Sequence, residues 1–129
     1  MTEPLHSPES PVQLVRTHET DWKPLNESGV SGISVKVLRF DKGTGRAPTF
    51  LLKFEPGATY PAHDHPAGEE VFVLEGEVTF GKHHLKAGDY LYTPPSGKHA
   101  VWSRQGCAML LCVPKEVVIL TDAHTASAV

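Results

Sequence analysis

The chain has 129 residues, which is enough for one domain of ordinary size. Hydrophobic residues make up 40% of the sequence and the formal net charge is -3, both ordinary for a small globular protein. The composition has no basic excess, so it excludes nucleic-acid binding and attachment to an anionic membrane as main functions.

The chain has no run of about 18 apolar residues, and its first ten residues lack the apolar core of a signal peptide. We therefore expect a protein without membrane spans that stays in the cytoplasm. Residues 1–19 are expected to form a flexible N-terminal arm with a short edge strand over residues 12–17. Residues 20–120 are expected to form the folded domain, and residues 121–129 a frayed tail.

Short strands are expected along the whole domain. The segment SGISVKVLRF, residues 31–40, alternates apolar and polar side chains with the period of two that is typical of a half-buried strand. Eleven glycines and eleven prolines indicate many turns between strands. Further strands are expected at residues 49–55, 69–74, 77–80, 83–86, 90–93, 99–103, 107–113 and 115–120. No amphipathic helix of useful length interrupts this series, so the sequence predicts an all-β protein, and a jelly-roll barrel fits the number and length of the strands.

The strand that begins at Glu69 carries apolar side chains on both faces. Val71 and Val73 share one face with Glu69, while Phe72 and Leu74 share the other, so the strand is expected to be covered twice. If the first face lines the barrel, then a second sheet, the N-terminal arm or a partner subunit must cover the second face. We predict a homodimer on this ground.

Two histidines and a glutamate form a candidate metal site. His63 and His65 are two residues apart, so on a strand both imidazoles project to the same face. A turn containing proline and glycine precedes Glu69, so a neighbouring strand could bring this carboxylate back against the two rings. His99, which follows another turn-rich stretch, is a fourth candidate ligand. Imidazoles with a carboxylate suit one divalent transition metal, Fe(II), Mn(II), Zn(II) or Ni(II), and the ligand set does not choose among these ions.

Other residues near this site have weaker claims. Glu70 competes with Glu69 as the carboxylate ligand, but the strand alternation turns Glu70 outward. Catalytic residues besides the metal ligands are not identified. Five side chains near the motifs could face a pocket, although packing or surface positions are the commoner roles for each: Tyr60, Tyr92, Arg39, Lys53 and Trp102. His83 and His84 are expected to be solvated, with a supporting role behind the ligands as the alternative.

The two cysteines, Cys107 and Cys112, are expected on one strand. They are five residues apart and therefore face opposite sides, so no disulfide is expected between them. Ser96 and Ser103 lie near His99, but a metal that takes the histidine leaves no partner for a nucleophilic triad, so metal-independent hydrolysis is not favoured.

The segment GATYPAHDHPAGEEVFVLEG resembles the first motif of the cupin superfamily. His63, His65 and Glu69 match its ligands and spacing, framed by Gly57 and Gly76. A second motif keeps its spacing through Gly88, Pro94 and His99, with Ser96 where a glycine is usual and Ser103 where an asparagine is usual. The segments DWKPL, HPAGEEVFVLEGEV and RQGC together resemble the ChrR-type cupins, which include the metal-binding domain of an anti-sigma factor and acetylacetone-cleaving dioxygenases.

This resemblance implies a cupin jelly-roll barrel over about residues 20 to 114, and it leaves two functions open. The first is a small Fe(II)- or Mn(II)-dependent enzyme with oxygenase-type chemistry on a chelating small molecule. Diketone-cleaving relatives use three histidines only, so Glu69 separates this chain from their specific reaction. The second is a zinc-binding sensory or regulatory cupin without enzymatic activity.

Overall fold

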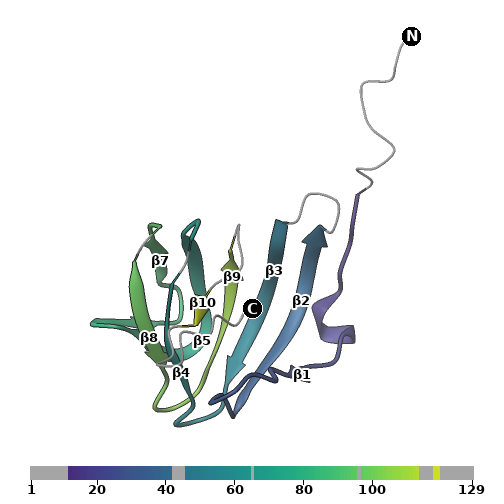
Figure 1. Cartoon of the computed structure of the whole chain (residues 1–129). Helices are drawn as coiled ribbons and strands as arrows, with labels where there is room; N and C mark the ends of the chain where they lie inside the picture. The colour runs from purple at the N-terminus through teal and green to yellow at the C-terminus, as the bar shows by residue number, and fades with distance from the viewer. Residues whose placement is uncertain (1–11, 42–45, 65, 96, 114–117, 120–129) are drawn as a thin grey trace.

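The structure, a computed structural model, describes residues 12–41, 46–64, 66–95, 97–113 and 118–119. Within these ranges the chain forms ten β-strands and one turn of 3-10 helix (Figure 1). Every strand pair is antiparallel, so the all-β prediction is confirmed. The elements are η1 (Thr17–Glu19), β1 (Lys23–Pro24), β2 (Ile33–Asp41), β3 (Arg46–Phe54), β4 (Thr59–Asp64), β5 (Glu69–Phe80), β6 (His83–Lys86), β7 (Tyr90–Thr93), β8 (Lys98–Trp102), β9 (Cys107–Cys112) and β10 (Val118–Ile119).

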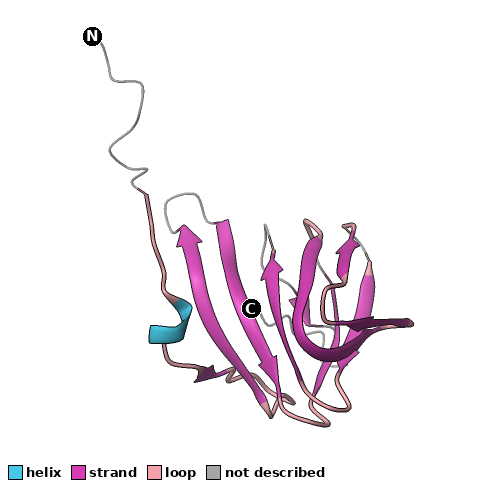
Figure 2. Ribbon diagram, turned by 180° about the vertical axis from the view of Figure 1, so that it is seen from behind, coloured by secondary structure: helices cyan, strands magenta, loops and turns pink. Residues whose placement is uncertain are grey.

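The sheet curls around β5 into the cupin jelly roll that the sequence predicts (Figures 1 and 2). The first part of β5 pairs with β7 and β9, and its last residues pair with β6 and β8. A register shift between Val73 and Glu75 lies where the strand passes from one group of neighbours to the other. The two separate strands expected on either side of Gly76 are therefore one continuous strand.

The edge strand expected over residues 12–17 is not present. Residues 12–16 pair with no described strand, and η1 begins at Thr17. Val12 is 97% exposed and Leu14 is 71% exposed, so this segment has no buried surface to support a strand, and β propensity alone does not form one. Residues 1–11 and 121–129 lie outside the described residues, as does most of the strand expected over 115–120.

The simple alternation expected in β2 is broken in its middle. Lys36 is 8% exposed whereas Val37 is 50% exposed, the reverse of the prediction. The ammonium group of Lys36 donates a hydrogen bond to the carbonyl oxygen of Thr17 at 2.6 Å and lies 4.7 Å from the ring centroid of Trp22. Lys36 is therefore covered by the segment that precedes β1. The residues next to Lys36 in the sequence give no sign of this tertiary contact.

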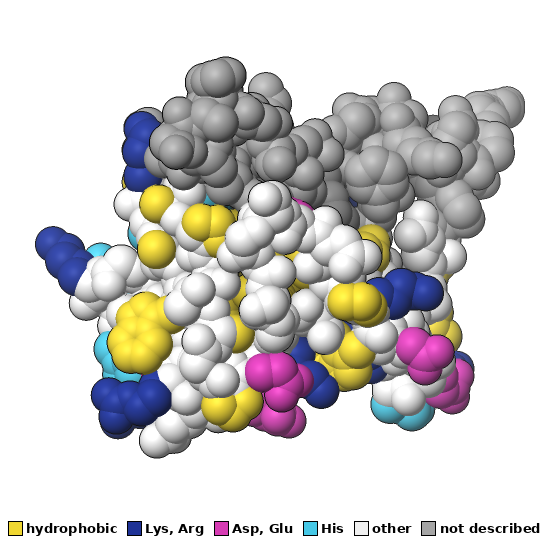
Figure 3. Space-filling model, turned by 60° about the horizontal axis from the view of Figure 1, so that its bottom comes forward, with side chains coloured by type: hydrophobic (Ala, Val, Ile, Leu, Met, Phe, Trp, Pro, Cys, Tyr) yellow, Lys and Arg dark blue, Asp and Glu magenta, His cyan; other side chains and the backbone are white. Residues whose placement is uncertain are grey.

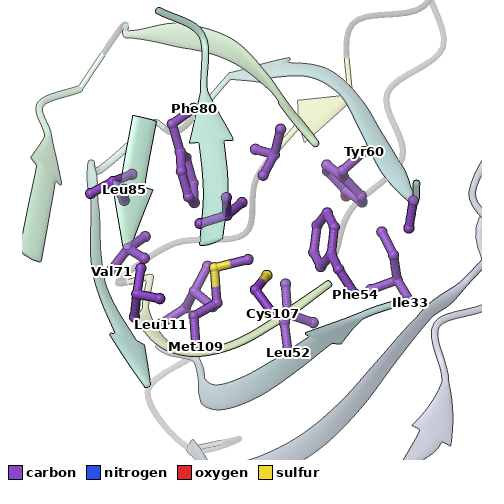
Figure 4. Packing of buried hydrophobic residues seen from close by; sticks show 14 of the residues in the cluster. Ile33, Leu52, Phe54, Tyr60, Val71, Phe80, Leu85, Cys107, Met109 and Leu111 are labelled. Atoms are coloured by element: carbon purple, nitrogen blue, oxygen red, sulfur yellow. The ribbon is translucent and has the colours of Figure 1, made fainter. Parts of the chain in front are cut away.

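The hydrophobic core fills the inside of the curled sheet (Figure 4). Val71 and Val73 are 1% and 0% exposed, which agrees with the face assigned to the barrel interior. Phe72 and Leu74, on the other face, are 40% and 44% exposed.

On the lower face of the molecule, basic and acidic side chains are interspersed with apolar ones (Figure 3). None of the described residues forms a helix of the length and apolarity that a membrane span requires.

Candidate metal centre

Three of the four predicted ligands converge on one point inside the curled sheet. His63 lies on β4 and His99 on β8, and the two are direct cross-strand partners in the antiparallel ladder. Glu69 is the first residue of β5. One ligand atom from each of these side chains lies within 4.8 Å of the other two. The fourth predicted ligand, His65, lies outside the described residues, so its place in the site stays a prediction.

The two imidazoles are oriented by their surroundings. The ring centroids of His63 and His99 are 5.0 Å apart, with an interplanar angle of 83°. Nδ1 of His63 lies 2.9 Å from the carbonyl oxygen of Pro61, so a proton on Nδ1 is donated to that oxygen and Nε2 is left to bind a cation. Nε2 of His99 lies 3.5 Å from Oε1 of Glu69, and the edge of the His99 ring meets Phe80 at 5.1 Å.

The chemistry of this cluster fits a divalent transition metal. His63 and Glu69 are 3% and 4% exposed, and the side chain of His99 is 9% exposed. A buried carboxylate needs a compensating positive charge or hydrogen bonds, and a metal ion supplies the charge. Ligand bonds of about 2.0 to 2.2 Å place the donor atoms of one ion within about 4 Å of one another, so only a small adjustment would close the site.

Glu70, the competing carboxylate, is turned away from this site. Its side chain is on the exposed face of β5, where Oε1 accepts a hydrogen bond from the hydroxyl of Tyr90 at 2.8 Å. Because Glu69 and Glu70 are adjacent on one strand, they cannot both reach the histidines.

A small cavity lies beside the cluster. Its volume is about 30 Å³, which is room for about two water molecules. Apart from His63, Glu69 and Tyr60, its walls are apolar and come from Leu25, Leu52, Phe54, Phe80, Val101, Met109 and Leu111. The described walls of the cavity are therefore mostly hydrocarbon, and a low-dielectric wall strengthens the attraction between a bound cation and its ligands.

Tyr60 is the one of the five suggested pocket residues that lines this cavity. Its ring is 6% exposed and meets the His63 ring edge-on at 4.9 Å. Its hydroxyl donates a hydrogen bond to Oε1 of Glu27 at 2.9 Å. Burial raises the pKa of Glu27 above its usual value, and burial with the nearby carboxylate of Glu27 raises the pKa of Tyr60 as well.

The other suggested residues lie elsewhere. Tyr92 and Trp102 are 53% and 40% exposed, and Arg39 is exposed. Nζ of Lys53 lies 5.3 Å from the ring centroid of Trp22. His83 and His84 are exposed, as predicted. Sequence reasoning missed the roles of Leu25, which lines the cavity, and of Glu27, which accepts the hydrogen bond from Tyr60. Leu25 ends the DWKPL segment that resembles the ChrR-type cupins, whereas the only sequence signal at Glu27 is a Leu-Asn-Glu-Ser-Gly composition, which predicts a turn and nothing more.

The sequence matches one family model, described as the ChrR Cupin-like domain, over residues 10–115. No curated protein is similar enough to the chain to count as a match.

Solved structures share the fold at low sequence identity. A candidate acetylacetone dioxygenase from Methylibium petroleiphilum is 17% identical with a TM-score of 0.85, and the match covers 97% of this chain and 92% of that chain. An acetylacetone dioxygenase from Acinetobacter johnsonii is 14% identical with a TM-score of 0.79, over 100% of this chain and 90% of that chain. In the structure of SigE in complex with the anti-sigma factor ChrR from Rhodobacter sphaeroides, the matched chain is 23% identical with a TM-score of 0.63. The match covers 76% of this chain and 50% of that chain. Likeness at this level of identity shows the fold alone.

Proposed function

The chain belongs to the ChrR cupin-like domain family, and on that premise we propose that it is a single-domain metalloenzyme with His63, His65, Glu69 and His99 as ligands. The observation that supports the proposal most directly is the convergence of the buried His63 and Glu69 with the half-buried His99, with one ligand atom of each within 4.8 Å of the other two. Fe(II) and Mn(II) are the preferred ions, and Zn(II) and Ni(II) fit the same ligand set.

The proposed substrate is a small molecule that chelates the metal through two oxygen atoms. A bound Fe(II) or Mn(II) ion supplies Lewis acidity and access to oxygenase-type redox chemistry. The chain's own contribution is to hold the ion among apolar walls and to keep bulk water away from it. The fold of two acetylacetone dioxygenases supports this reading, although Glu69 argues against their specific reaction.

Metal analysis of the purified protein tests the site. We expect about one equivalent of metal in the wild-type protein and its loss in His63→Ala and Glu69→Ala. Glu70→Ala is the matched control, because Glu70 lies on the same strand but on the exposed face. Circular dichroism establishes that each variant is folded. Metal retained by both ligand variants, or no metal bound by the wild type after reconstitution, would contradict the proposal.

A zinc-binding sensor is the second candidate, and the cavity favours it. The cavity beside His63 and Glu69 has a volume of about 30 Å³, which leaves room for water but not for a diketone, although His99 also lines a more open hollow of about 400 Å³. Oxygen uptake by the iron-loaded protein against a panel of diketones and catechol-like chelators separates the two functions. Uptake with any of these compounds supports the enzyme, whereas tightly held zinc and no uptake support the sensor.

We also propose a homodimer formed through the exposed face of β5 and its neighbours. Phe72, Tyr90 and Tyr92 are 40%, 56% and 53% exposed, and together they leave apolar surface on the order of 300 Å² uncovered. We expect a dimer mass at micromolar concentration and a shift to monomer in Leu74→Asp, while Trp102→Ser on β8 leaves the mass unchanged. A monomer mass for the wild type would contradict the dimer.

The cytoplasmic location and the domain limits of 20 and 120 stay predictions.

A further inference from the structure

The connection between β1 and β2 closes one end of the cavity. Figure 1 shows β1 and this connection running along the lower end of the curled sheet. Leu25 forms part of the cavity wall, and both Leu25 and Val30 pack against the hydrophobic core. We propose that residues 25–32 are a removable cover of the candidate metal centre, and that the hydrogen bond from Tyr60 to Glu27 is the latch that holds the cover shut.

The cover has few backbone ties of its own. Its ends are joined by the hydrogen bond from the amide of Leu25 to the carbonyl oxygen of Ile33 at 2.9 Å. Inside it, the amide of Val30 donates to the carbonyl oxygen of Glu27 at 3.1 Å. Gly29 and Gly32 have φ values of 78° and 76°, a conformation that glycine adopts without strain. A further bond, from the amide of Glu55 to the carbonyl oxygen of Gly32 at 2.8 Å, ties the last residue of the cover to the end of β3. These bonds shape the cover and hold its ends, but none of them fastens its middle to the barrel.

Tyr60 supplies that fastening from β4. Its hydroxyl donates to Oε1 of Glu27 at 2.9 Å, while the centroid of its ring lies 4.9 Å from that of His63 with the two rings nearly perpendicular. One side chain therefore contacts both the cover and a candidate ligand. Tyr60 is 6% exposed and Glu27 is half-buried, so the bond is partly sheltered from water, and a sheltered bond to a carboxylate is stronger than one at the surface.

The small size of the cavity explains why the hydrogen bond from Tyr60 to Glu27 matters for access to the ligands. With the cover in place, about 30 Å³ admits roughly two water molecules, whereas sites for organic ligands are commonly several hundred Å³. Removing the Leu25 wall would widen the opening of the cavity to solvent on this side. The latch therefore controls access to the ligands from the side of the cover, which extends the proposed function without depending on the identity of the metal.

Hydrogen exchange of the metal-free protein tests the latch by itself. We expect Tyr60→Phe, which keeps the ring and removes the hydroxyl, to speed exchange of the Leu25 and Val30 amides about tenfold. Tyr90→Phe is the matched control, because the Tyr90 hydroxyl makes the same kind of bond, to Glu70 at 2.8 Å, on the exposed face. Glu27→Gln keeps an acceptor and is expected to lie close to the wild type. Unchanged exchange at Leu25 and Val30 in Tyr60→Phe would overturn the latch.

A second measurement uses the cobalt-loaded protein. We expect 1,10-phenanthroline to remove Co(II) about tenfold faster from Tyr60→Phe than from the wild type or from Tyr90→Phe. Equal rates of removal would show that the cover does not control access, and this would also overturn the proposal. If the protein binds no metal, the proposed function is wrong. The exchange experiment uses metal-free protein, so it still decides whether Tyr60 holds residues 25–32 in place, and failure of the function can be told apart from failure of the latch.

Discussion

Ser103 replaces the asparagine usual in the second motif, and the structure shows how the shorter side chain is used. Ser103 is 0% exposed, and its hydroxyl oxygen accepts a hydrogen bond from the amide of Gly106 at 2.8 Å. The same hydroxyl donates to the backbone carbonyl oxygen of Glu77. The carboxylate of Glu77 in turn accepts from the amide of Gln105 at 2.7 Å, so serine and glutamate together hold the turn before β9.

The carboxylate of Glu77 makes the stability of this turn depend on pH. The hydrogen bond from the amide of Gln105 is the main cause that lowers the pKa of Glu77 below its usual value. A carboxyl whose pKa is lower in the folded state contributes stability above its unfolded pKa, and this contribution is lost as the pH falls through the folded pKa. We expect Glu77→Gln to lower the free energy of unfolding at pH 7 by about 1 to 2 kcal/mol, and by less at pH 3.

Urea denaturation of the wild type and the variant at both pH values measures this difference. Glu75→Gln, an exposed carboxylate on the same strand, is the control and is expected to change the free energy of unfolding by less than about 0.5 kcal/mol. A Glu77→Gln effect of the same size at pH 3 and pH 7 would mean that the amide geometry matters and the charge does not.

At the scale of elements, Gly76 lies where β5 changes its pairing from β7 and β9 to β6 and β8. Its φ is 75°, and a Cβ built there would overlap the carbonyl oxygen of Gly106 and lie 2.9 Å from Cα of Cys107. Both neighbours are backbone atoms, so they cannot move without disturbing the ladder between β5 and β9. The motif glycine is therefore required by the close approach of two backbones.

We expect Gly76→Ala to lower the free energy of unfolding by at least about 3 kcal/mol, the cost of a left-handed alanine plus that of the overlap. Gly29→Ala is the matched control, because Gly29 has a φ of 78° but no atom within 4 Å of a built Cβ. It is expected to lose only about 1 to 2 kcal/mol. Equal losses in the two variants, measured by chemical denaturation, would show that the sheet yields to the added methyl group.

Across the whole molecule, the sequence predicts what depends on local pattern and misses what depends on distant contacts. β6 and β7 lie where they were expected because short turns fix both ends of each strand, and His63, Glu69 and His99 meet because their strands pair as the motifs imply. The burial of Lys36 depends on Thr17, 19 residues earlier. The latch depends on Glu27 and Tyr60, which are 33 residues apart, and neither residue has a local signal for this contact.

The candidate metal centre ties together β4, β5 and β8, so metal binding should stabilise the whole fold. An ion that binds the folded state alone adds about 2.7 kcal/mol at a free concentration of 100 times its Kd. For a domain of this size, that corresponds to a rise in Tm of about 10 °C. We expect this rise when Mn(II), Fe(II) or Zn(II) is added to the metal-free protein, and little change with Mg(II), which prefers oxygen ligands.

Thermal melts followed by circular dichroism measure this rise, and two variants locate its origin. Glu69→Ala should melt at the same temperature with and without metal, whereas Glu70→Ala should keep the full rise, because Glu70 lies on the opposite face of β5. A rise that survives in Glu69→Ala would mean that the three histidines hold the ion without the carboxylate, and a rise that also survives in His63→Ala would place the ion at another set of side chains. A rise lost in both variants would point instead to a change in β5 itself, since the two substitutions share that strand and not a site.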